Sequence, residues 1–189
     1  MEAVQLLRNR VDALAGMTRG LIEDAAGLDW ATPLLPGTSP LGLTLWHMPR
    51  TVDWAVNTCI RVAPELADEP RFGELPDPQR FGFGTALSEQ QATEAASQVH
   101  SDVLVAYSDA VFAIASEWVA TLSPEDLDAP VPDFLGRQSA RPAYATDGAL
   151  EEVQGLVDVP VGILLARPTM SHLLMHTGEV DLIIQVARR

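Results

Sequence analysis

The chain contains no lysine, and all twelve of its basic residues are arginine. Without a lysine amine, Schiff-base catalysis and a phosphate-binding loop of the lysine-containing type are both excluded. Cations are also few relative to anions: 26 acidic residues give a formal net charge of −14. Because a nucleic-acid backbone is recognised through clustered cations, this composition argues against nucleic acid as a partner.

Cysteine and long hydrophobic runs are scarce as well. Cys59 is alone, so the chain has no intrachain disulfide and no cysteine metal cluster, and we expect a small buried hydrophobe there. No stretch approaches the roughly 20 apolar residues of a membrane span, and residues 1–8 resemble an amphipathic helix more than a signal peptide. We therefore expect a cytoplasmic protein without a membrane partner. With 189 residues and 47% hydrophobic content, residues 1–189 should form a single domain.

Apolar residues at helical spacing, together with capping signals, predict an all-α fold. The main helices are expected over about 3–27, 40–62, 88–121 and 168–187. Shorter helices are expected after Ser123 and over 149–157, whereas 159–166 is open between a strand and an extended segment. Residues 63–87 and 129–148 are rich in proline and glycine and predict two long loops.

Four long helices predict a helical bundle of antiparallel type. The long connection between the second and third helices would also allow a crossover. Pro49 lies inside the second predicted helix, so that helix either begins near residue 46 or is kinked there.

His172 and His176 are the most informative pair of residues, because they stand four apart in the last predicted helix. At that spacing, two imidazoles project from one helix face and can reach the same metal ion. Glu179 lies on the same stripe, within about 20° of His172 at 100° per residue. The alternative is that these are polar side chains without a special role, satisfied by hydrogen bonds or by solvent.

A metal site needs a third donor, and His47 in the second helix is the natural candidate. Three imidazoles with one open coordination position are typical of a catalytic site, and zinc or nickel would suit them. Trp54 lies about 20° from His47 on the same stripe and could line a pocket, although core packing is the simpler interpretation. The fourth histidine, His100, is expected to be an exposed helix residue.

Two stretches together resemble the DinB-like superfamily. They are Leu45-Trp-His-Met-Pro-Arg-Thr-Val-Asp-Trp54 and Ser171-His-Leu-Leu-Met-His-Thr-Gly-Glu-Val180. The resemblance implies a DinB-like four-helix bundle with long loops between helices two and three and between helices three and four. It also implies a divalent metal held by His47, His172 and His176, with water or a substrate thiolate in the remaining position.

Members of that superfamily include mycothiol-dependent maleylpyruvate isomerase and bacillithiol transferases. The resemblance therefore implies a thiol-dependent S-transferase or isomerase that uses mycothiol or a similar thiol on a small electrophile. Where the family often has Gly-Gln, this chain has Gly178-Glu179, which predicts a catalytic or ligand-supporting carboxylate. Arg50 is a candidate to receive an anionic substrate or the thiol.

Two other functions stay open at this point. One is a non-catalytic metal-binding or ligand-binding regulatory bundle, and the other is a metal-dependent hydrolase. Helix faces of such bundles would also allow a homodimer.

Overall fold

A computed structural model describes residues 3–189, apart from the side chain of Met170. Over this range every named element is helical, and a single β-bridge joins Pro130 to Pro160, so the prediction of an all-α fold is confirmed. Here η marks 3₁₀ or π helices. The elements are α1 (Ala3–Asp24), α2 (Leu41–Asp53), η1 (Trp54–Arg61), η2 (Leu66–Asp68), η3 (Pro70–Phe72), α3 (Pro78–Phe81), α4 (Glu89–Ser97), α5 (Ser101–Val119), α6 (Pro124–Asp128), α7 (Phe134–Ser139), η4 (Pro142–Tyr144), α8 (Asp147–Val153), η5 (Gln154–Leu156), α9 (Val161–Ala166), η6 (Arg167–His172) and α10 (Leu173–Ala187).

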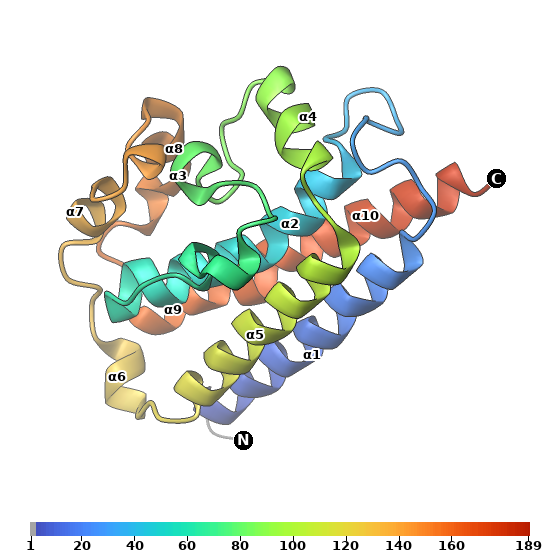
Figure 1. Cartoon of the computed structure of the whole chain (residues 1–189). Coiled ribbons are helices and arrows are strands. Elements are labelled where there is room, and N and C mark those ends of the chain that lie inside the picture. Colours follow the sequence, from blue (N-terminus) through green and yellow to red (C-terminus); the bar gives the residue numbers. More distant parts are fainter. Residues whose placement is uncertain (1–2) are drawn as a thin grey trace.

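Four long helical rods lie side by side in the molecule (Figure 1). They are α1, the continuous pair α2–η1, α5, and the continuous run α9–η6–α10, which we call the last rod. The first and third rods are antiparallel, because Arg8 hydrogen-bonds to Ser116 and Arg19 pairs with Asp109. Apolar side chains from all four rods form the core.

The second and third rods run in the same direction. Near the start of α2, a Cβ added to Gly42 would lie 3.0 Å from the carbonyl oxygen of Ala96, shortly before α5 begins. About two turns further along α2, Arg50 hydrogen-bonds to Tyr107 of α5. Parallel neighbours cannot be joined by a short turn, so residues 62–100 return along the molecule before α5 begins. The long connection is thus a crossover rather than a simple up-and-down link.

The predicted third helix over 88–121 is divided in two. Its start is as expected, because Ser88 and Gln91 form a reciprocal capping box. The helix then stops after Ser97 and resumes at Ser101, with His100 extended between the two parts. No proline or glycine lies at this break; α4 packs on α2, whereas α5 packs mainly along α1 and also contacts α2.

Both histidine-bearing rods contain a proline and a π-helical segment. The second rod begins at Leu41 and continues through Pro49 without a late start, then widens into π-helical η1. The last rod begins at Val161, before the predicted start at Pro168, which instead lies in π-helical η6. Of the segment 159–166, left open between strand and extended chain, residues 161–166 are helical, whereas Pro160 is extended and makes the β-bridge to Pro130. A π turn accommodates a proline because it changes the register of the backbone hydrogen bonds, and such turns are frequent at functional sites.

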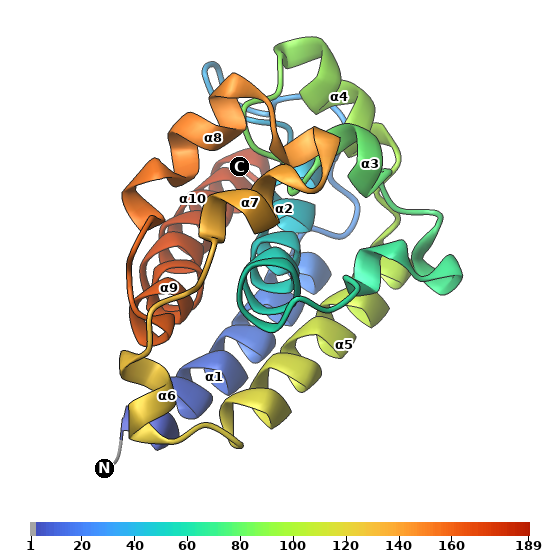
Figure 2. The ribbon, with the colours of Figure 1, turned by 90° about the vertical axis from the view of Figure 1, so that its left-hand side faces the viewer.

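The two predicted loops are built from short helices that cover one end of the second rod. In Figure 2, α3, α7 and α8 lie over α2 on the side away from α1 and α5. Over residues 129–148 the chain forms α7, η4 and the start of α8, and the capping box of Ser123 with Asp126 starts α6 as expected. These segments position the walls of the site described below.

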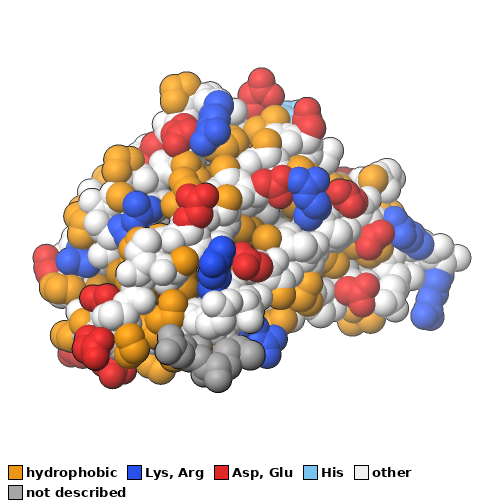
Figure 3. Space-filling model, turned by 90° about the horizontal axis from the view of Figure 1, so that it is seen from below, with side chains coloured by type: hydrophobic (Ala, Val, Ile, Leu, Met, Phe, Trp, Pro, Cys, Tyr) orange, Lys and Arg blue, Asp and Glu red, His pale blue; other side chains and the backbone are white. Residues whose placement is uncertain are grey.

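The surface carries charge of both signs. On the face seen from below, acidic and basic side chains are interspersed with apolar ones (Figure 3). Among residues 3–189, none of the helices has the length and hydropathy required to cross a membrane.

Candidate metal centre

His47, His172 and His176 come together between the second rod and the last rod. One ring nitrogen from each lies within 4.8 Å of the others, an arrangement that could hold a metal ion. His47 lies on α2, His172 ends the π-helical η6, and His176 lies one turn later on α10. His100 is exposed at the start of α5 and takes no part.

The ring of His47 is fixed by a backbone carbonyl. Its Nδ1 lies 2.6 Å from the carbonyl oxygen of Phe83, which can only accept, so Nδ1 carries the proton and Nε2 keeps its lone pair. Burial, reinforced by the neighbouring His172 and His176, lowers the pKa of His47 to about 3. The ring is therefore neutral at pH 7, as a metal ligand must be.

His176 is oriented in a similar way, by a carboxylate. Its Nδ1 lies 2.9 Å from Oε2 of Glu179, and this hydrogen bond is the main reason that the pKa of Glu179 is below its usual value. The other ring nitrogen, Nε2, is buried and has no hydrogen-bond partner among the described residues. A buried acceptor without a partner costs about 1–3 kcal/mol, which a bound cation would remove.

His172 completes the set. Burial, with contributions from His176 and Arg167, lowers its pKa to about 4, so this ring is also neutral at pH 7. Its Nε2 lies 2.8 Å from Nε2 of His47. Since Nε2 of His47 keeps its lone pair, Nε2 of the neutral His172 ring donates this hydrogen bond, and an ion bound between the rings would require the other tautomer of His172, with its proton on Nδ1.

The residues fit a divalent metal on two observations. First, the convergent atoms are all imidazole nitrogens, the donors that zinc and nickel share. Second, two imidazoles on one tetrahedral ion have nitrogens about 3.3 Å apart, and the observed 2.8 Å between His47 and His172 needs only a small rotation of either ring to match. Nε2 of His176, which has no hydrogen-bond partner among the described residues, would supply the third donor.

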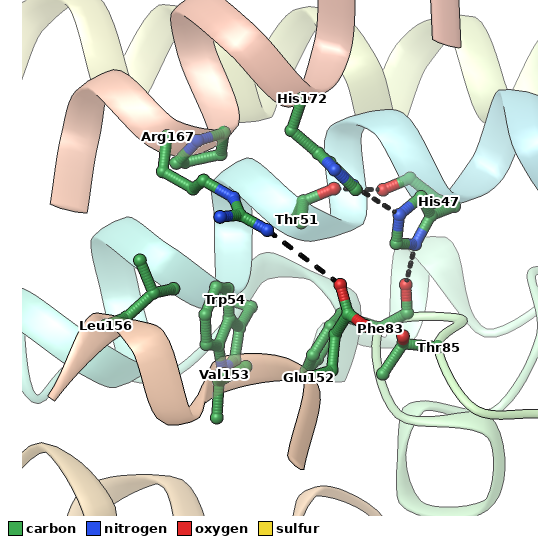
Figure 4. A pocket seen from close by; sticks show the side chains of 11 residues that line it. His47, Thr51, Trp54, Phe83, Thr85, Glu152, Val153, Leu156, Arg167 and His172 are labelled. Atoms are coloured by element: carbon green, nitrogen blue, oxygen red, sulfur yellow. Dashed lines mark hydrogen bonds and ion pairs between the residues drawn. The ribbon is translucent and has the colours of Figure 1, made fainter. Parts of the chain in front are cut away.

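Two pockets meet at the histidines. The first is narrow, with a volume of about 30 Å³, and is lined by His47, Thr51, Trp54, Phe83, Thr85, Glu152, Val153, Leu156, Arg167, Pro168 and His172 (Figure 4). The second is wider, at about 270 Å³, and reaches all three histidines from the side of residues 84–87. His47, His172, Thr85 and Glu152 line both. A small molecule could therefore reach the cluster from either side.

Of the other predicted site residues, Trp54 lines a pocket, whereas Glu179 and Arg50 do not. Trp54 lines the first pocket, where its ring stacks on Phe83 at 4.6 Å and its indole N–H donates to Gln138. Glu179 lines neither pocket and lies behind His176, so its position suits orienting that ring rather than contacting a substrate. Arg50 also lines neither pocket and has no exposed surface.

Arg50 is instead the centre of a buried polar network. Its guanidinium donates to Asp53, Glu65, Tyr107, Tyr144 and the carbonyl oxygen of Gly82. Enclosed by these partners and lining neither pocket, the guanidinium lies away from the place where the sequence analysis expected it to receive a substrate anion.

The network nevertheless supports the site. Arg50 donates a hydrogen bond to the carbonyl oxygen of Gly82. The carbonyl oxygen of the next residue, Phe83, accepts from Nδ1 of His47, which lies one turn before Arg50 on α2. Gly84 follows with φ of +90°, and a Cβ there would lie 3.2 Å from Nδ1 of His47. The segment 82–84 is thus shaped to support that ligand.

Three residues of the site carried no signal in the sequence. Phe83 acts through its backbone carbonyl, which no side-chain pattern reveals. Glu152 and Arg167 form an ion pair at 3.9 Å across the first pocket. Glu152 lies in a short acidic helix, and Arg167 precedes Pro168, where the last helix was expected only to begin; neither stood apart from ordinary surface charge.

A comparison of the chain with protein-family models and with curated proteins finds no match to either.

Proposed function

We propose that this protein is a divalent-metal enzyme in which His47, His172 and His176 hold the ion and one coordination position faces the pockets. The observation that carries the proposal is the buried, unpartnered Nε2 of His176, which points to the same place as the nitrogens of His47 and His172. A purely structural histidine cluster would be expected to satisfy that atom with a donor.

The reaction we propose is the transfer or isomerisation of a small electrophile with a low-molecular-weight thiol such as mycothiol. Zinc or nickel bound by three imidazoles would lower the pKa of a thiol in the open position and so supply the nucleophile. The buried Cys59 does not suit that role, because burial raises the pKa of its thiol and Cys59 lines neither of the two pockets at the histidines.

The chain's own residues would provide orientation and shelter. The carbonyl of Phe83 and the carboxylate of Glu179 hold two of the three rings with Nε2 directed at the common point. Trp54 and Phe83 form an apolar wall that limits water beside the histidines. On this proposal the four rods, with their crossover between the second and third, are a DinB-like bundle elaborated by short helices.

The first test is the metal content of protein purified without a histidine tag. We expect about one divalent ion per chain in the wild type and a loss of at least tenfold in occupancy for His172→Ala or His176→Ala. His100→Ala is the matched control, since it removes an exposed imidazole elsewhere. Equal metal content in all four proteins would contradict the site.

The second test separates the candidate reactions. Metal-loaded protein is offered small electrophiles with and without mycothiol, bacillithiol or glutathione. Turnover that requires a thiol supports the proposal, whereas thiol-independent hydrolysis would indicate a metal-dependent hydrolase. Bound metal with no turnover in either case would indicate a binding or regulatory protein.

A further inference from the structure

The first pocket joins an apolar wall to one arginine. Trp54 and Phe83 are stacked with their rings 26° apart, and Leu156 continues the wall towards Arg167 (Figure 4). Among the described residues that line the two pockets, Arg167 is the only arginine. The chain has a net charge of −14 and few cations, so an arginine that lines a pocket beside the histidines is a candidate for binding an anion.

The guanidinium of Arg167 is weakly engaged. Its nearest carboxylate oxygen, on Glu152, is 3.9 Å away, beyond hydrogen-bond distance. Both side chains are about half exposed, at 47% and 50%, and exposed pairs of this kind contribute little to stability. Arg50, by contrast, has five hydrogen-bond partners and no exposed surface, so its donors are already used. Arg167 therefore keeps donors available for a ligand.

We propose that Arg167 receives the carboxylate of a small substrate by displacing Glu152. A planar guanidinium matches a carboxylate with two parallel hydrogen bonds, which the present long pair with Glu152 does not provide. The rest of the substrate lies along Trp54 and Phe83 and ends beside His47 and His172, which line the same pocket.

The shape of the pocket narrows the substrate class. A volume of about 30 Å³ holds little more than one water-sized group, so a ring system is excluded and only the end of a short carbon chain can enter between the apolar walls. The substrate is thus a short carboxylate with an apolar, electrophilic portion. This inference rests on the proposed function for its placement of the reacting end at the histidines, but the recognition of the carboxylate by Arg167 stands independently of the metal.

Glu152 is the internal competitor for the anion. Its side chain is half exposed and also lines the second pocket, so its carboxylate can move away from Arg167. Removing the charge of Glu152 should strengthen the binding of a carboxylate, and removing the charge of Arg167 should weaken it. The two variants are therefore expected to act in opposite directions.

The experiment compares crotonate with crotonamide, its neutral isostere, by NMR titration of metal-free and zinc-loaded protein. We expect wild-type protein to bind crotonate about tenfold more tightly than crotonamide in both forms. Arg167→Gln should abolish this preference, and Glu152→Gln should increase it severalfold. Arg71→Gln, which removes an exposed cation of another ion pair, is the control for net charge and should leave the preference unchanged.

Several results would overturn the inference. These are a preference for crotonate that survives Arg167→Gln, a weaker affinity for crotonate in Glu152→Gln, or no binding of either compound. A preference confined to the zinc-loaded protein and kept in Arg167→Gln would show that the ion receives the carboxylate instead. Failure of the proposed metal site alone would give a different result: the protein would bind no zinc but would still prefer crotonate to crotonamide.

Discussion

At the scale of the residue, the site depends on groups that hold two of the three imidazoles through Nδ1. The spacing of His172 and His176 was readable from the sequence, and His47 followed as the third donor. What the sequence could not show is that the backbone carbonyl of Phe83 and the carboxylate of Glu179 place the proton on Nδ1 of His47 and of His176. Tautomers depend on tertiary contacts, and these contacts join residues up to 36 positions apart.

Glu179→Gln tests this support directly. The amide keeps the size of the side chain but loses the charge that raises the basicity of His176, so we expect affinity for zinc to fall about tenfold. Competition with a chelator measures the change. Asp181→Asn removes the same charge from an exposed position on the same helix, where the carboxylate accepts a hydrogen bond from Gln185. An equal loss in this control would show a general effect of charge.

At the scale of the element, the long helices were predictable and their connections were not. Periodicity and capping identified α1, the second rod and α10, because these signals are local. The break at His100 and the early start of the last rod at Val161 arise from packing against other rods, which no local signal reports. The short helices of the two Pro-rich segments likewise depend on anchors from distant residues such as Arg50 and Glu65.

Arg50→Met should show how strongly these anchors contribute. The substitution leaves Glu65 with only partial compensation from Arg141, so we expect the free energy of unfolding to fall by about 3 kcal/mol. Denaturant unfolding measures it. Arg71→Met, in the exposed pair with Glu69, is the control and should cost less than about 1 kcal/mol. Similar losses in both variants would contradict an anchoring role for Arg50.

The segment 82–84 gives a second test at this scale. Gly84→Ala places a Cβ near Trp46 and His47 at a positive φ of 90°, so both stability and zinc affinity should fall. Gly37→Ala is a matched control, because Gly37 has φ of +80° but nothing within 4 Å of the added Cβ. We expect a comparable backbone cost of about 1 kcal/mol in both variants and a loss of zinc affinity only in Gly84→Ala. A loss of zinc affinity in Gly37→Ala as well would show that the effect is not local.

At the scale of the whole molecule, metal binding and folding should be linked. The histidines lie on two rods that are brought together only by the fold, so an ion that binds all three stabilises the folded state. With zinc at a hundredfold excess over its dissociation constant, the gain is about 2.7 kcal/mol, which calorimetry would register as a higher melting temperature. We expect no such shift in His172→Ala. A shift of the same size in that variant would place the zinc elsewhere.

The measurement that tests the central claim most directly is X-ray absorption at the zinc edge of protein loaded with one ion per chain. Three imidazole nitrogens and one oxygen ligand at about 2.0–2.2 Å are predicted, with the oxygen replaced by sulfur at about 2.3 Å when mycothiol is added. Fewer than three imidazoles, or a spectrum that His172→Ala leaves unchanged, would contradict a metal centre built from His47, His172 and His176.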